Sequence, residues 1–186
     1  MSKLTSEKEL DSIVSRGDDN IVDWQLSREF AELWLEDGIL NGDYSENSTL
    51  WEIPIAIYTH KGDIKFYEFR IISGGKTVGA IVCAATKDFG CPVVYEGLKE
   101  GYADELTELY KTGKLTADQL PRIVDDGYPN VVAGVIKETR GVVNSFSGYI
   151  DLNSGNKVSE NEINTIMSYE DVLSEYSEYI DESLTP

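Results

Sequence analysis

Residues 50–85 read LWEIPIAIYTHKGDIKFYEFRIISGGKTVGAIVCAA, and this stretch decides the fold class. It contains three runs rich in β-branched and aromatic residues, at 50–58, 64–72 and 77–85. The turn-forming tetrapeptides HKGD and SGGK separate these runs. Since connections this short join antiparallel strands, we expect three consecutive antiparallel strands here.

The second of these runs alternates between two sets of side chains. Phe66, Glu68 and Arg70 belong to one set and the neighbouring aromatic and aliphatic residues to the other. This alternation is typical of a strand with one buried and one solvated face. We therefore expect Glu68 and Arg70 to lie on the surface as a charge pair.

Before the strands, apolar residues recur at helical spacing. Asp18-Asp19-Asn20 offers capping groups, and Gly38 interrupts the pattern. This predicts an amphipathic helix with its apolar stripe toward the core. We expect the buried stripe to comprise Val22, Trp24, Leu26, Phe30, Leu33 and Trp34.

Further elements follow the three strands. Pro92 to Tyr95 predicts a fourth strand, and the apolar residues of 102–110 predict a short helix closed by Gly113. Thr116 to Gln119 has the spacing of a capping box, which predicts another helix carrying Leu120 and Ile123. Strands are expected at 130–136 and 142–152, and capping boxes at Ser159/Glu162 and Ser168/Asp171 predict helix at the end.

These patterns predict an α+β fold, with a mostly antiparallel sheet of about five or six strands and N-terminal, central and C-terminal helices. A length of 186 residues with 41% hydrophobic content suffices for one well-buried core. We expect a single domain over residues 18–186. Residues 1–17 are rich in charge and poor in apolar periodicity, which predicts a partly disordered tail.

The strongest global signal is acidity, because 34 acidic and 16 basic residues leave a net charge of −18. This charge repels nucleic acids and anionic lipid surfaces, so we expect neither as a direct partner. No Lys or Arg follows Lys157, and the acidic end is a candidate site for a basic protein partner or a solvated helix face. The candidate partner-binding residues are Glu170, Asp171, Glu175 and Glu178.

The sequence leaves the compartment open. Its longest apolar runs, such as Val78–Ala85, are too short to cross a bilayer, which predicts a soluble protein. The charged start lacks the apolar region of a signal peptide, although a signal peptide removed earlier would leave no trace. Both a cytoplasmic and a secreted location fit.

His60, Cys83 and Cys91 are all the imidazoles and thiols of the chain. They cannot supply the four soft ligands of a structural zinc site. The two cysteines flank a short turn, and both a disulfide and two separate thiols fit this spacing. A Cys–His nucleophilic pair through His60 lacks a third, orienting residue.

One stretch, 151–162, carries a candidate metal site. It reads DLNSGNKVSENE and places oxygen ligands near positions one, three, nine and twelve of a calcium-binding loop, with Gly155 and Asn156 where that loop carries a ligand and then glycine. A strand, a turn and a helix cap account for the same residues without metal. The candidate calcium ligands are Asp151, Asn153, Ser159 and Glu162.

Known catalytic templates are missing from the sequence, which contains no nucleophile elbow, phosphate loop or dinucleotide fingerprint. We therefore expect a non-catalytic binding module with a protein partner. The alternatives are a small enzyme of unrecognised type and a secreted or cell-surface structural domain.

The pattern of strand-like and turn-like segments from Trp24 to Val158 resembles the prosegment and prosegment-like inhibitor domains of streptopain-type, papain-like cysteine peptidases. The resemblance is carried by Ile57-Tyr58, by FYEF at 66–69, by VGAIV at 78–82, by PVVY at 92–95 and by GYIDL at 148–152. It implies an inhibitory or targeting domain that covers the cleft of a papain-like peptidase. No peptidase Cys–His pair is recognisable in this chain, which implies a stand-alone inhibitor, an orphaned relative or a fragment.

Overall fold

The computed structural model describes residues 4–16, 19–89, 92–97, 101–137 and 145–164. The helices are α1 (Glu7–Arg16), α2 (Trp24–Leu40) and α3 (Ala103–Lys111), with short 3₁₀ turns η1 (Lys87–Phe89) and η2 (Glu160–Glu162). The strands are β1 (Thr49–Leu50), β2 (Ile55–Tyr58), β3 (Ile64–Ser73), β4 (Lys76–Ala84), β5 (Val93–Gly97), β6 (Gln119–Asp125), β7 (Val131–Lys137), β8 (Gly148–Ile150) and β9 (Lys157–Val158).

Within the described residues, all the strands join one nine-stranded sheet with the order β5-β4-β3-β2-β6-β7-β8-β9, and β1 pairs with β3. The β2–β6 pairing is parallel, and every other pairing is antiparallel. The α+β class is therefore confirmed, and the sheet is larger than the five or six strands expected. The three strands of residues 50–85 form as predicted, except that the first is split into β1 and β2.

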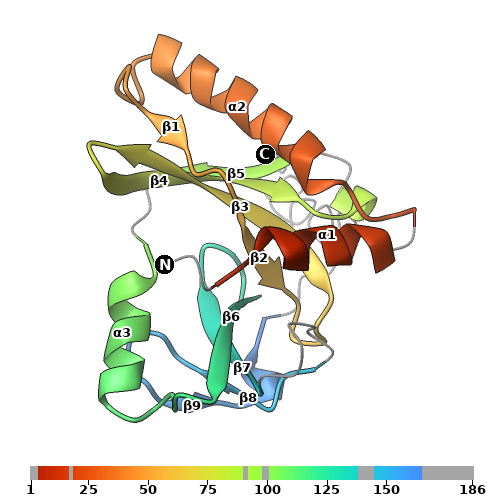
Figure 1. Ribbon diagram of the computed structural model, residues 1–186, viewed down its shortest axis with the longest axis vertical. Helices are drawn as coiled ribbons and strands as arrows, with labels where there is room; N and C mark the ends of the chain where they lie inside the picture. Colours follow the sequence, from red (N-terminus) through yellow and green to blue (C-terminus); the bar gives the residue numbers. More distant parts are fainter. Residues whose placement is uncertain (1–3, 17–18, 90–91, 98–100, 138–144, 165–186) are drawn as a thin grey trace, which may run out of the picture.

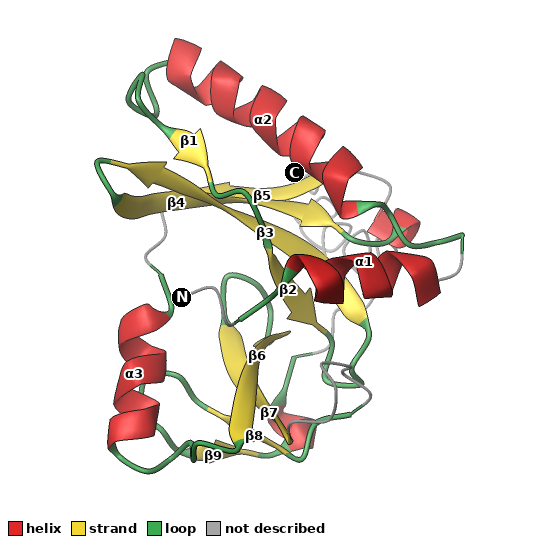
Figure 2. Cartoon of the chain, viewed as in Figure 1, coloured by secondary structure: helices red, strands yellow, loops and turns green. Residues whose placement is uncertain are grey.

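Helices α1 and α2 lie on one side of the central strands, and α3 stands beside β6 (Figures 1 and 2). α1 and α2 pack over β2, β3 and β4, burying Leu10, Trp24 and Leu35 against alternate strand residues such as Tyr67 and Phe69. Side chains on the opposite face of the same strands, such as Phe66 and Val82, belong to a second buried cluster that also includes residues of β6, β7 and α3. The central strands are consequently buried on both faces.

This double burial overturns the expectation that Glu68 and Arg70 lie on the surface. Glu68 is fully buried and Arg70 is 3% exposed, and their side chains form an ion pair of 3.1 Å. The Tyr102 hydroxyl donates to Glu68 Oε2 at 2.6 Å, and the Arg70 guanidinium lies 4.5 Å from the Tyr102 ring centroid. Mutual pairing thus compensates two charges in a face that Tyr102, just before α3, covers.

The N-terminal segment also differs from the expectation. Residues 1–17 were predicted to be a partly disordered tail, yet they contain helix α1, with Leu4 and Leu10 buried. The Thr5 hydroxyl accepts a hydrogen bond of 3.0 Å from the Ala56 amide of β2. The apolar residues of α1 are few and form one short face. A search for long periodic runs in the sequence therefore misses this helix.

The predicted helix after Thr116 is a strand instead. The amide of Thr116 does donate to the Gln119 side chain at 3.0 Å, as in a capping box, but the chain then continues as β6. Pro121 explains the difference, because the residue before a proline is disfavoured in helical conformation. The run Ile123-Val124 that follows is β-branched and suits the sheet interior.

Other local predictions are confirmed. α3 forms where a short helix was expected, and Gly113 follows it at φ +73°. β7 covers most of the expected 130–136 strand, whereas β8 takes only three residues of the expected 142–152 strand. The predicted C-terminal helix falls outside the described residues. None of the helices in the described part of the chain is long and apolar enough to cross a bilayer.

Candidate protein-binding surface

Helix α2 begins after Asp23, whose side chain caps it by accepting a hydrogen bond of 2.9 Å from the Gln25 amide. Asp23 thus takes the role that the sequence suggested for Asp18-Asp19-Asn20. The face that α2 turns to the sheet comprises Trp24, Ser27, Ala31, Leu35 and Gly38. Most of these residues are small, which lets the helix lie close to β3 and β4.

Much of the apolar stripe that the sequence predicted to be buried is exposed instead. Leu26, Leu33 and Trp34 are 48%, 59% and 41% exposed, and Phe30 is half-buried. Of the two tryptophans expected in the core, Trp24 alone is there. Helical spacing identifies an apolar stripe but does not show which element the stripe packs against. In α2, the stripe of small residues packs on the sheet. We call Leu26, Phe30, Leu33 and Trp34 the α2 surface.

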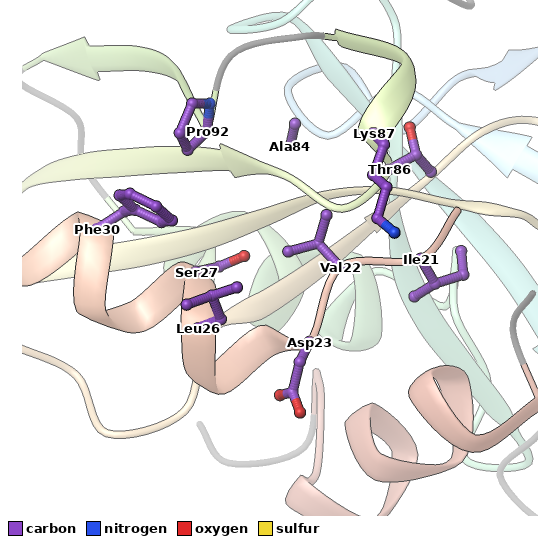
Figure 3. A pocket seen from close by; sticks show the side chains of 10 residues that line it. All are labelled: Ile21, Val22, Asp23, Leu26, Ser27, Phe30, Ala84, Thr86, Lys87 and Pro92. Carbon is purple, nitrogen blue, oxygen red and sulfur yellow. The ribbon is translucent and has the colours of Figure 1, made fainter. Parts of the chain in front are cut away.

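A groove of about 460 Å³ runs beside the α2 surface (Figure 3). Leu26 and Phe30 of α2 contribute to one side, and Ala84 of β4 and Pro92 contribute to the other. Val22, just before α2, also lines the groove. The remaining lining residues are Ile21, Asp23, Ser27, Thr86 and Lys87. Groove and α2 surface together form a continuous apolar site of the kind that binds protein partners.

Several contacts hold α2 rigidly against the sheet. Arg28 Nη1 donates to the Glu52 carbonyl oxygen at 2.8 Å, which ties the helix to the segment before β2. The Cys83 thiol of β4 lies 3.5 Å from the Ser27 carbonyl oxygen and donates to it. Near the other end, a Cβ on Gly38 would lie 2.7 Å from the Tyr44 ring, so a larger residue there would displace that ring. The α2 surface is therefore preorganised, which lowers the entropy lost on binding.

A buried polar cluster links α1 to the sheet. Glu9 Oε1 accepts hydrogen bonds of 2.8 Å from Arg122 Nε and of 2.7 Å from the Tyr58 hydroxyl. All three residues are less than a tenth exposed. Burial raises the pKa of Tyr58, and the neighbouring Glu9 carboxylate raises it further, so this hydroxyl acts as a permanent donor.

A third buried ion pair joins Lys65 of β3 to Asp125 of β6, at 2.5 Å. The Tyr128 amide also donates to Asp125, at 2.8 Å. Among the described residues, neither this pair nor the Glu9 and Glu68 clusters line the groove beside α2. Each joins segments that are distant in sequence, and we assign all three to fold stability rather than to chemistry.

The calcium candidates lie in the turn after β8. Asp151 Oδ1 accepts hydrogen bonds of 2.9 Å and 2.8 Å from the amides of Asn153 and Ser154. These bonds hold the pKa of Asp151 below its ordinary value of 3.8. Glu162 Oε1 instead accepts from the Ser159 amide at 3.4 Å, so the predicted capping box is confirmed, on the short turn η2. The four candidates thus divide into two local hydrogen-bonded units.

We predict that Asp151→Ala lowers the free energy of unfolding by about 1 kcal/mol at neutral pH, by removing turn hydrogen bonds. Because the folded-state pKa of Asp151 is depressed, its contribution is present above the ordinary value of 3.8 and is lost as the pH falls through the folded-state pKa. Thermal unfolding of both proteins across pH checks this. The matched control is Asp104→Ala, at an exposed carboxylate.

The same melts test the calcium hypothesis. With millimolar calcium against excess chelator, a local turn gives one midpoint for the wild-type protein in both solutions. A calcium site at Asp151, Asn153, Ser159 and Glu162 would raise the wild-type midpoint in calcium, and Asp151→Ala would abolish that rise. The second pattern would contradict the turn interpretation.

The remaining sequence candidates do not meet at one place in the described structure. His60 lies in the β2–β3 turn, with Nε2 3.8 Å from Glu160 Oε1. Cys83 is buried under α2, and Cys91 lies outside the described residues. Among the described residues, no group of three or more His, Cys, Asp and Glu is placed to hold a metal ion. The acidic candidates Glu170, Asp171, Glu175 and Glu178 also lie outside the described residues.

No protein-family model, curated protein or solved structure matches the chain. The functional inference therefore rests on the α2 surface and the groove beside it. A second stripe on α2, formed by the small residues Ser27, Ala31 and Gly38, is the sequence signal that could have identified this surface.

Proposed function

We propose that the chain is a non-catalytic protein-binding module and that the α2 surface, with its groove, is the contact site. The observation that carries the proposal is the exposure of Leu26, Leu33 and Trp34 on a helix whose other stripe is already buried. Exposed apolar residues that adjoin a groove are typical of protein interfaces. Aromatic side chains, here those of Trp34 and Phe30, often contribute most of the binding energy of a protein interface.

The partner class that we propose is a papain-like cysteine peptidase, on which the chain acts as an inhibitor or targeting domain. The sequence resemblance to streptopain-type prosegments supports this class. The test is a binding-kinetics series with a papain-like peptidase from the same organism. We expect a complex with a dissociation constant at or below the micromolar range, and no binding at micromolar protein would reject the peptidase as partner.

The acidic C-terminal segment is expected to speed the encounter. Long-range attraction acts on association and is screened by salt, whereas dissociation depends on short-range contacts. Neutralising four carboxylates as amides should slow association roughly tenfold at low salt and flatten its salt dependence. The dissociation rate should stay nearly unchanged. The substituted residues are Glu170, Asp171, Glu175 and Glu178.

A matched control keeps the same change in net charge but moves it away from the C-terminal segment. It replaces exposed carboxylates on the loop after α2 and on α3, namely Asp43, Glu46, Asp104 and Glu108. An equal effect in this control would show that net charge alone steers association. A large rise in the dissociation rate of the C-terminal variant would place that segment inside the interface and contradict its steering role.

A further inference from the structure

The α2 surface has an acidic border. Residues seven apart lie about 20° from each other around a helix, so Leu26 and Leu33 form one line and Glu29 and Glu36 form another beside it. All four side chains are exposed. Glu32 is engaged by Arg28 at 3.2 Å, but neither Glu29 nor Glu36 makes an ion pair within the described residues.

The backbone around this surface offers a partner few hydrogen bonds. The amides and carbonyls inside α2 are bonded to one another along the helix. On the far side of the groove stands Pro92, which has no N–H to donate. A partner segment must therefore satisfy its own backbone, as a helix does and an isolated extended strand does not.

We propose that the α2 surface binds an amphipathic helix that carries Lys or Arg beside its apolar stripe. The apolar stripe covers Leu26, Phe30, Leu33 and Trp34, while the basic residues face Glu29 and Glu36. This inference rests on the proposed function and specifies the partner's chemistry. A second copy of the chain fits less well, because Arg28 is the one basic residue of α2 and already binds Glu32.

The test uses model peptides of roughly 18 residues, about five helical turns. One contains Leu and Lys in an amphipathic pattern, the second replaces every Lys with Glu, and the third scrambles the Leu/Lys sequence so that the stripe is lost. Binding to the full chain is measured by calorimetry at two salt concentrations. We expect the amphipathic Leu/Lys peptide to bind at least about tenfold more tightly than either of the others.

Substitutions locate the site and separate its two components. Leu33→Ser should weaken the amphipathic Leu/Lys peptide about tenfold, and Glu29→Gln with Glu36→Gln should weaken it and reduce its salt dependence. The control Tyr110→Ser removes a partly exposed aromatic side chain from α3, on a different helix from the α2 surface. Equal binding of the scrambled peptide, or no effect of Leu33→Ser, would overturn the proposal. Either result would mean that the peptides are attracted to an acidic protein in general and not to the α2 surface.

Two further outcomes distinguish this inference from the proposed function. If Leu33→Ser abolishes binding to the peptidase but no model peptide binds, the α2 surface is a contact site and the basic-helix inference is wrong. If the Leu/Glu peptide binds equally well, the acidic border plays no part and the inference is again wrong. Dimerisation in sedimentation runs that Leu33→Ser abolishes would assign the surface to a second copy and overturn the basic-helix partner.

Discussion

Replacing Glu9 with alanine is expected to lower the free energy of unfolding by about 3–5 kcal/mol, as for other buried ion pairs that lose one partner. The variant leaves the Arg122 guanidinium, which is 5% exposed, without the carboxylate that it contacts at 2.8 Å. The buried Tyr58 hydroxyl loses its acceptor as well. Since small domains are stable by about 5–15 kcal/mol in total, the loss is a large part of the whole.

Urea denaturation at neutral pH measures this effect. Glu7→Ala is the matched control, because Glu7 belongs to the same helix but is exposed, and we expect it to cost less than about 1 kcal/mol. The double variant Glu9→Leu with Arg122→Met removes both charges and should recover most of the loss. Equal stability of Glu9→Ala and Glu7→Ala would mean that α1 does not pack on the sheet as described.

The second large effect is expected at the α2 surface. The double variant Leu33→Ser with Trp34→Ser should weaken binding to the peptidase partner by about 2 kcal/mol or more, roughly 30-fold. The two side chains are 59% and 41% exposed, so their loss leaves no cavity in the core. The stability of the free protein should therefore change by no more than about 0.5 kcal/mol per substitution.

Tyr110→Ser controls for this variant, because it removes an aromatic side chain of similar exposure from a different helix, α3. Tyr110 is 40% exposed and does not line the groove. The affinity of this control for the partner should match that of the wild-type protein. In the double variant, the loss of affinity should appear mainly as a faster dissociation rate. Equal affinity of all three proteins would contradict the assignment of the α2 surface as the contact site.

The local signals in residues 50–85 were sufficient to predict the centre of the fold. Alternating side chains and glycine-containing turns specify antiparallel strands through nearest-neighbour geometry, so β3 and β4 could be predicted without knowing their surroundings. Whether a strand face is covered depends on elements far along the chain. Glu68 and Arg70 look like surface residues in the sequence because nothing near them indicates that Tyr102, far along the chain, packs against them.

The candidate site was misjudged for a related reason. α2 carries a stripe of large apolar residues and a stripe of small ones, and hydrophobicity ranks the large stripe as the core face. The sheet selects the small stripe, because Ser27 and Ala31 allow close contact with β3 and β4. The Glu9–Arg122 pair was equally inaccessible to sequence reasoning, since the fold brings together residues 113 positions apart.

Amide hydrogen exchange of the complex with the peptidase tests the central claim most directly. If the α2 surface and its groove are the contact site, exchange should slow at residues 20–35 and 84–89, which form the groove and the adjacent helix face. The β8–β9 edge of the sheet should exchange as in the free protein. Slower exchange at that edge, with residues 20–35 unchanged, would contradict the account and place the partner elsewhere on the sheet.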